Sequence, residues 1–159
     1  MEIEEVAKEF HARYSAVGKW YRYQLQLASV ASPFVGNYSW HLPIHNFDRE
    51  RLRQALPHLV GYKDFAAFAN EAKLRGEKTV RHLWKAEWSV GADGLDYLDF
   101  VGEGFLYKMV RNLVGFLVEV SQSKRSADEL PELLASRDRR QASQAAPARG
   151  LFLMDVFYP

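Results

Sequence analysis

Cysteine is absent from the 159 residues of this chain. Its absence excludes disulfides, thiolate metal sites and a cysteine nucleophile, and it suits a reducing cytosol. The sequence also lacks a long apolar run and a signal-like amino terminus, so it indicates neither membrane insertion nor secretion, and we expect a cytoplasmic protein. Charge of one sign is not in excess, because the formal net charge is only +1. Total charge therefore does not indicate a nucleic-acid partner, although local basic clusters still can.

Hydrophobic residues, by contrast, make up 48% of the chain and aromatic residues 14%. A chain of this length buries roughly two thirds of its extended surface on folding. The sequence therefore predicts a single compact domain over residues 1–159, or one half of a larger unit. No internal repeat supplies a second half.

Three segments have the pattern of β-strands. Residues 20–27 alternate, with Tyr21 and Tyr23 on one face and Arg22 on the other. Residues 79–101 predict an antiparallel hairpin turning at Gly91-Ala-Asp-Gly. One face of its first strand is expected to carry Val80, His82, Trp84, Ala86, Trp88 and Val90. The closing segment 151–159 is almost continuously apolar, which predicts a strand buried on both sides or inside an assembly.

Helical periodicity is clearest over residues 105–120, where apolar residues recur at three- and four-residue steps. Asp48 is placed to cap a helix that ends near residue 58, and a second short helix is expected over 64–74. Ser126, with a glutamate three residues later, forms a capping box before a further short helix.

Arg111 is the most informative residue of the central helix. It shares a stripe with Lys108 and Gly115, where a ligand or another backbone could approach closely. No carboxylate lies three or four residues away on either side. A partly buried guanidinium here needs an anion from elsewhere in the fold or from a ligand. A solvated position or a structural acid partner are the alternatives that the residues leave open.

Two further groups of residues have compositions found in binding sites. His41 and His45 are four apart, but Pro43 between them argues against a helix and no third ligand is evident, so we expect no metal site. The stretch Arg137–Arg140 is basic and lies in a polar loop, where phosphate contact and ordinary solvation are equally compatible with the sequence.

Four ordered motifs resemble the TruA family of tRNA pseudouridine synthases. Gly-Phe-Leu-Tyr-Lys-Met-Val-Arg-Asn-Leu-Val-Gly, at residues 104–115, is similar to the family's Phe-Leu-x-His-Met-Val-Arg-Asn-Ile-Val-Gly. Phe-His-Ala-Arg-Tyr-Ser at 10–15, with Tyr-Arg-Tyr at 21–23, resembles Phe-His-Ala-Arg-Phe-Ser and its Tyr-x-Tyr strand. Lys-Asp-Phe-Ala-Ala-Phe at 63–68 and Ala-Pro-Ala-Arg-Gly-Leu-Phe-Leu at 146–153 also resemble family motifs. The resemblance covers essentially the whole chain.

The resemblance implies an α+β fold, the β-α-β-β-α-β half of a pseudouridine synthase, with an antiparallel sheet covered by helices. It implies isomerisation of uridine to pseudouridine in the anticodon arm of tRNA, without metal or organic cofactor. The family's catalytic aspartate lies in a Gly-Arg-Thr-Asp motif of its amino-terminal half, and this sequence contains no such motif. We therefore expect this chain to be the carboxy-terminal portion, inactive alone and needing that upstream half. Members of the family are commonly homodimers.

By the same resemblance, Arg111 orients and ionises the catalytic aspartate, and Tyr21 contacts the target base. Weaker candidates for contact with the RNA backbone are Arg13, Arg22, Lys108 and Arg139. Lys108 stands where the family usually has histidine, so the polarity near the site departs from the family pattern.

Two other readings remain. The missing aspartate favours a non-catalytic RNA-binding or self-associating module derived from the same family. An RRM-like binder shares the element order, but residues 95–104 lack the basic-Gly-aromatic-Gly pattern of that domain.

Overall fold

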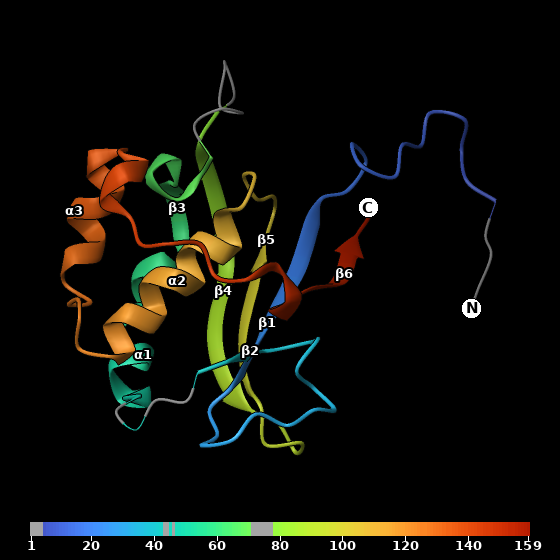
Figure 1. The fold of residues 1–159 in the computed structure, drawn as a ribbon. Coiled ribbons are helices and arrows are strands. Elements are labelled where there is room, and N and C mark those ends of the chain that lie inside the picture. Colours follow the sequence, from blue (N-terminus) through green and yellow to red (C-terminus); the bar gives the residue numbers. More distant parts are fainter. Residues whose placement is uncertain (1–4, 43–44, 46, 71–77) are drawn as a thin grey trace.

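The computed structural model describes residues 5–42, 45, 47–70 and 78–159. Within them, three α-helices cover one face of a six-stranded, mostly antiparallel sheet (Figure 1). The strands are β1 (Gly18–Gln26), β2 (Trp40–His41), β3 (Gly61–Asp64), β4 (Val80–Val90), β5 (Asp96–Gly102) and β6 (Leu151–Phe157). The helices are α1 (Arg49–Ala55), α2 (Met109–Ser121) and α3 (Glu129–Ser136). The predicted α+β class is confirmed.

Strand β1 pairs with three other strands of the sheet, whose order is β2-β1-β5-β4-β3 with β6 also on β1. On one side β1 pairs along most of its length with antiparallel β5. Its other side is shared, because parallel β2 pairs with the Leu25 end and antiparallel β6 with the Gly18 end. The predicted alternation is confirmed, since Tyr23 and Leu25 are fully buried while Arg22 lies on the opposite side.

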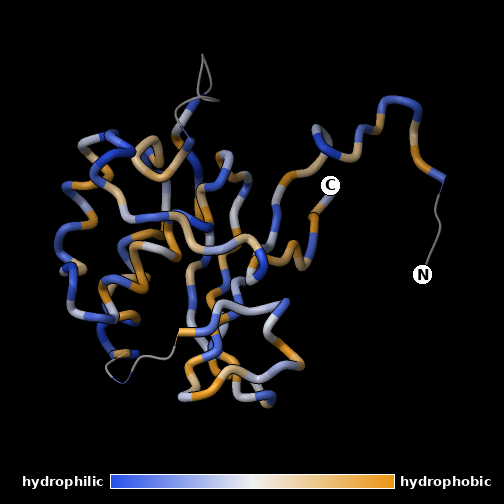
Figure 2. Tube along the Cα trace, viewed as in Figure 1, coloured by the Kyte–Doolittle hydropathy of each residue, from blue (hydrophilic) through white to orange (hydrophobic). Residues whose placement is uncertain are grey.

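Helix α2 contributes eight residues to the buried core cluster, more than any other helix or strand. Met109, Leu113 and Leu117 on this helix have no exposed surface and belong to one buried cluster with Leu98 and Phe100 of β5. Figure 2 shows apolar residues recurring along α2 and along the strands that it covers. Deleting such a fully buried side chain typically costs about 2–5 kcal/mol of stability, so this pairing fixes the helix on the sheet.

The predicted helix over 105–120 begins later than its apolar pattern suggested. Helix α2 starts at Met109, and the N–H of that residue closes a turn on Leu106 O at 3.0 Å. Lys108, immediately before the helix, has a left-handed backbone with φ 62°. A residue in that region cannot continue a right-handed helix, so residues 105–108 instead form the connection from β5 to α2, with a turn at 107–108.

The predicted helix over 64–74 is wrong for the part that the structure describes. Residues 61–64 form β3 on the edge of β4, and Ala66–Phe68 is a single 3-10 turn. Asp64 accepts the N–H of Ala66 at 3.0 Å, which caps this turn. Residues 71–74 lie outside the described residues. The cap at Asp48 is confirmed, although the first helix continues as a 3-10 turn after Ala55. The capping box at Ser126 forms only in part: Ser126 N donates to Glu129 Oε1 at 2.7 Å, but Ser126 Oγ accepts from Asp128 N, and α3 begins at Glu129 with Asp128 as its N-cap.

The predicted hairpin is confirmed as β4 and β5, but its face pattern breaks in the middle. A bulge puts Leu83 opposite Gly102 and Lys85 opposite Val101, so Trp84 is the extra residue. Leu83 is buried against the helices, whereas 43% of Trp84 is exposed. The prediction that Trp84 shares one face with Ala86 and Trp88 is therefore wrong.

The closing segment is a strand, as predicted, but it is not buried on both sides. Among the described strands β6 pairs only with β1, and Leu153 and Met154 are 51% and 43% exposed. The opposite edge of β6 is open. The alternative part of the prediction, burial inside an assembly, stays a prediction.

Candidate active site

A cleft of about 500 Å³ opens between β1 and the turn that leads into α2. Its lining includes three of the predicted site residues, Arg13, Tyr21 and Lys108, and also Lys19, which the sequence reading missed. The remaining lining residues are Phe105, Leu106, Tyr107, Met109, Val110 and Leu151. Seven of the ten lining residues are apolar or aromatic, and the other three are cations.

Tyr21 lies half-buried in this cleft. Its ring meets that of Phe105 edge to face, with centroids 5.0 Å apart. Burial raises the pKa of the Tyr21 phenol, which keeps the side chain neutral under physiological conditions. A neutral aromatic ring held by a second ring is a surface on which a flat apolar or aromatic group can pack.

Lys108 and Lys19 bring charge to the same cleft. The Lys108 ammonium is 5.7 Å from the centre of the Tyr107 ring. A cation directly before the first turn of α2 opposes the helix dipole, so it does not serve the stability of that helix. The arrangement instead gives this end of the cleft a positive potential that favours a bound anion.

Arg111 projects from α2 towards the segment that precedes β6. Its Nε donates to Ala146 O at 2.6 Å, and Ala146 N donates back to Arg111 O at 3.0 Å. The guanidinium is half-buried, and no described carboxylate lies within ion-pair distance of it. The missing acid predicted from sequence is therefore not supplied by the described part of this chain.

Gly115 explains how that segment comes so close to the helix. A Cβ at this position would overlap Gln144 O, so only glycine admits the crossing. The sequence reading expected close approach of a backbone or a ligand at Gly115, and the structure shows a backbone. Tyr23 fastens the same crossing, because its buried hydroxyl donates to Pro147 O at 2.7 Å. Burial raises the pKa of Tyr23, and the nearby Arg111 and Arg149 only partly offset this effect.

Arg22 does not reach the cleft. It lies on the opposite face of β1 and forms a bidentate pair with Asp99, through Nε at 2.9 Å and a terminal nitrogen at 2.8 Å. The hydrogen bond to Asp99 raises the pKa of Arg22 further. The rings of Trp20 and Tyr97 pack against its guanidinium, with centroids at 5.3 and 4.4 Å.

Arg139 is also held by contacts within the fold. One terminal nitrogen donates to the Asn112 side chain at 3.0 Å and the other to Ala142 O at 3.1 Å. Asn112 is buried and donates in turn to Phe68 O at 2.6 Å. The arginine therefore ties the loop after α3 to the first turn of α2, and it does not line the cleft that contains Tyr21.

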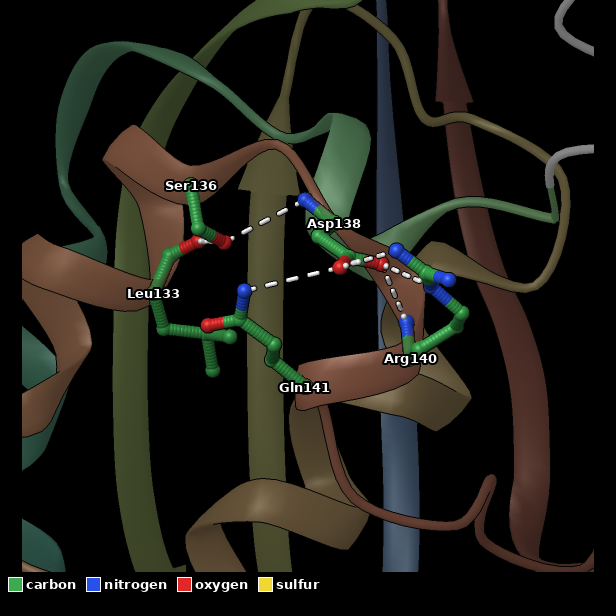
Figure 3. Close-up of polar contacts among 5 residues, drawn as sticks. All are labelled: Leu133, Ser136, Asp138, Arg140 and Gln141. Atoms are coloured by element: carbon green, nitrogen blue, oxygen red, sulfur yellow. Dashed lines mark hydrogen bonds and ion pairs between the residues drawn. The ribbon is translucent and has the colours of Figure 1, made fainter.

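The rest of that basic loop is engaged with acids of the same region (Figure 3). Asp138 accepts from the Arg140 backbone at 2.9 Å and from two of its guanidinium nitrogens at 3.0 Å. These hydrogen bonds lower the pKa of Asp138 to about 2. Arg137 pairs with Asp64 at 3.0 Å.

Neither a metal cluster nor a membrane-spanning helix occurs in the part of the chain that the structure describes. No group of three or more His, Cys, Asp or Glu side chains is placed there to hold a metal ion. No helix there is long and apolar enough to cross a membrane.

The cleft thus combines half-buried Tyr21 with three cations, while Arg111 is not among the residues that line it. Comparison with known proteins identifies the family. The sequence model described as tRNA pseudouridine synthase matches residues 55–159. The chain therefore belongs to the tRNA pseudouridine synthase family, and the resemblance found in its motifs is confirmed.

Individual relatives extend the match to nearly the whole chain. A tRNA pseudouridine synthase A 1 of Protochlamydia amoebophila is 45% identical over 158 residues, which cover 98% of this chain and 61% of the relative. A tRNA pseudouridine synthase A of a Geobacillus species is 40% identical over 157 residues, covering 99% of this chain and 62% of the relative. The chain thus spans about three fifths of the length of these relatives.

Proposed function

We propose that this chain forms the Arg111-bearing side of an active site that isomerises uridine to pseudouridine in the anticodon arm of tRNA. The observation that carries the proposal is the half-buried Arg111 guanidinium, which no described carboxylate neutralises. Family membership supports the reaction class. In the reaction the bond between uracil nitrogen and ribose is broken and a bond from a uracil carbon to the same ribose is formed, so the product is an isomer of the substrate.

Arg111 would act on the catalytic aspartate of the family, whose Gly-Arg-Thr-Asp motif is absent from this chain. Its Nε is fixed by Ala146 O, which leaves the two terminal nitrogens of the guanidinium to donate to a carboxylate side by side. Such a pair keeps an aspartate ionised and orients it. We propose that the part of the relatives outside the match supplies this aspartate.

Tyr21 and the cations of the cleft would bind the substrate. A uracil that has left its stack exposes both faces, and the ring of Tyr21, held by Phe105, offers a neutral surface to one of them. Arg13, Lys19 and Lys108 border the same cleft and would contact phosphates of the RNA backbone. The contacts of Arg22 and Arg139 within the fold assign these two arginines a structural part instead.

Assembly is part of the same proposal. The open edge of β6 exposes Leu153 and Met154, and unpaired strand edges readily add a further strand. The upstream half or a second copy in a homodimer would cover this edge. We propose that the assembled enzyme acts in the cytoplasm. Sedimentation of this chain, alone and with an added amino-terminal half, measures which of the two associates with it.

The deciding experiment measures pseudouridine formation on unmodified tRNA by this chain, alone and mixed with a separately expressed amino-terminal half of a tRNA pseudouridine synthase A. We expect activity only in the mixture. The same mixture made with Arg111→Ala should be inactive, whereas one made with Arg53→Ala, a change on the exposed face of α1, should be active.

Two other results of this assay would favour other functions. Activity of the chain alone would show that one of its own aspartates is catalytic and would refute the split-site proposal. Binding of tRNA without activity in any mixture would favour the non-catalytic RNA-binding module.

A further inference from the structure

The turn at the amino-terminal edge of the cleft is held by hydrogen bonds from its own side chains. His11 Nδ1 accepts the backbone N–H of Arg13 at 3.1 Å and that of Tyr14 at 3.3 Å. Ser15 Oγ accepts the N–H of His11 at 3.0 Å, and Ser15 N donates to His11 O at 2.8 Å. Because Nδ1 accepts, the ring proton of His11 lies on Nε2.

Burial does not account for the shape of this turn. His11, Arg13 and Tyr14 are all exposed, so the conformation depends on the side-chain hydrogen bonds rather than on a core. The rings of His11 and Tyr14 are 4.4 Å apart, and the Arg13 guanidinium lies 5.7 Å from the centre of the Tyr14 ring. Residues 11–15 thus form a locally stabilised turn that carries the Arg13 guanidinium.

The unit is fixed to the sheet by the end of the chain. Tyr158 donates its hydroxyl to Ala12 O at 2.7 Å, and its ring packs on Phe10 with centroids 5.0 Å apart. Val17 N donates to the carbonyl of Phe157, the last residue of β6, at 2.8 Å. These contacts place Arg13 on the border of the cleft that contains Tyr21.

We propose that His11 is a positioning residue for tRNA binding, which holds the turn so that Arg13 meets a backbone phosphate when the target base enters the cleft. The inference rests on the proposed function and names the residue that prepares one of its RNA contacts. An arginine on an unstructured segment loses conformational freedom when it binds, and a turn closed beforehand removes much of that cost. Ser15 acts in the same unit by closing it from the other side.

The test measures binding of this chain to an unmodified tRNA transcript over a series of salt concentrations. We expect His11→Ala and Arg13→Gln each to weaken binding about three- to tenfold and to lower the salt slope by about one phosphate contact. The double variant should bind no worse than Arg13→Gln alone, because the two residues act through one contact. His11→Asn should restore most of the affinity, since its amide oxygen can accept the same backbone N–H groups.

His58→Ala is the matched control, because it removes another exposed histidine at a distance from this cleft and should bind as wild type does. Thermal unfolding of each variant checks that the sheet is intact. Wild-type affinity of His11→Ala beside a weakened Arg13→Gln would overturn the inference and leave the proposed function standing, as would losses that simply add in the double variant. Absence of tRNA binding by the wild-type chain at every salt concentration, both alone and mixed with the amino-terminal half, would overturn both.

Discussion

The cations on the two faces of the sheet differ in their partners. On the face away from the helices, Arg22 pairs with Asp99 and Lys85 with Glu87, each at 2.8 Å. Around the cleft on the helix side, no ion pair involves Arg13, Lys19, Lys108 or Arg111 within the described residues. A paired cation is largely neutralised by its own fold, whereas an unpaired one keeps its attraction for an external anion. The two faces therefore differ in chemistry because their cations differ in pairing.

The largest expected effect comes from removing Arg111, a half-buried member of the unpaired group. In the completed enzyme, Arg111→Ala should reduce turnover by on the order of a hundredfold or more, the usual cost of losing a preorganised charge at a reacting centre. Arg111→Lys should recover only part of it, because a lysine cannot form the two parallel hydrogen bonds. Steady-state pseudouridine formation is the measurement. Arg22→Ala, on the paired face, serves as the control and should keep most of the turnover; equal losses in the two variants would erase the distinction.

The second effect concerns the crossing that fixes Arg111. Gly115→Ala places a methyl group against Gln144 O, so the segment must move away from α2. We expect a loss of roughly 1–3 kcal/mol in the free energy of unfolding, measured in urea. Gly36→Ala is the matched glycine, since its added Cβ meets Ser32 O at an ordinary 3.4 Å. Unchanged stability in Gly115→Ala would mean that the crossing is not as tight as the structure has it.

A smaller effect compares one lysine from each face. Lys19→Gln removes an unpaired cation of the cleft, and we expect tRNA binding to weaken with a salt slope lower by about one contact. Lys85→Gln removes a cation paired with Glu87 and should leave that slope unchanged. Binding titrations at several salt concentrations give both slopes. The comparison fails if Lys85→Gln lowers the slope as much as Lys19→Gln does.

The smallest effect lies in the paired loop after α3. The folded-state pKa of Asp138, about 2, is below the ordinary value of 3.8. The stabilisation from this carboxylate is therefore complete above pH 4 and is lost as the pH falls towards 2. Asp138→Asn should flatten the dependence of thermal stability on pH over that window only, and by a small amount because the group is exposed. If Asp138→Asn altered the pH dependence of thermal stability near pH 7, the lowered pKa of Asp138 would not be the cause of the effect.

The sequence predicted those features that depend on a local pattern. Alternation identified β1 and the hairpin, and the apolar period identified α2. It failed where a single residue changes the geometry. The bulge at Trp84 reverses the faces of β4, and the left-handed Lys108 delays the start of α2. The helix expected over 64–74 fails where it is described, because β3 pairs with β4 as far as Asp64 and only a 3-10 turn follows at Ala66–Phe68.

For the site, the motifs indicated Tyr21, Arg13 and Lys108, and the structure brings these three into one cleft. Lys19 was missed, although its place two residues before Tyr21 on the same strand face could have indicated it. Arg22 is adjacent to Tyr21 in sequence, so only its period-two position showed that it faces away. The contacts of Arg139 with Asn112 join residues 27 apart, and no local pattern reports such a contact.

The contact between Tyr158 and Ala12 has a practical consequence for handling this protein. Tyr158 is the penultimate residue, and its hydroxyl and ring hold the segment that carries Arg13. A purification tag fused to Pro159 would therefore begin one residue from a contact that shapes the edge proposed to bind RNA. Affinities measured with such a fusion would report the tag together with the cleft, so the tag should be cleavable and removed before any titration with tRNA.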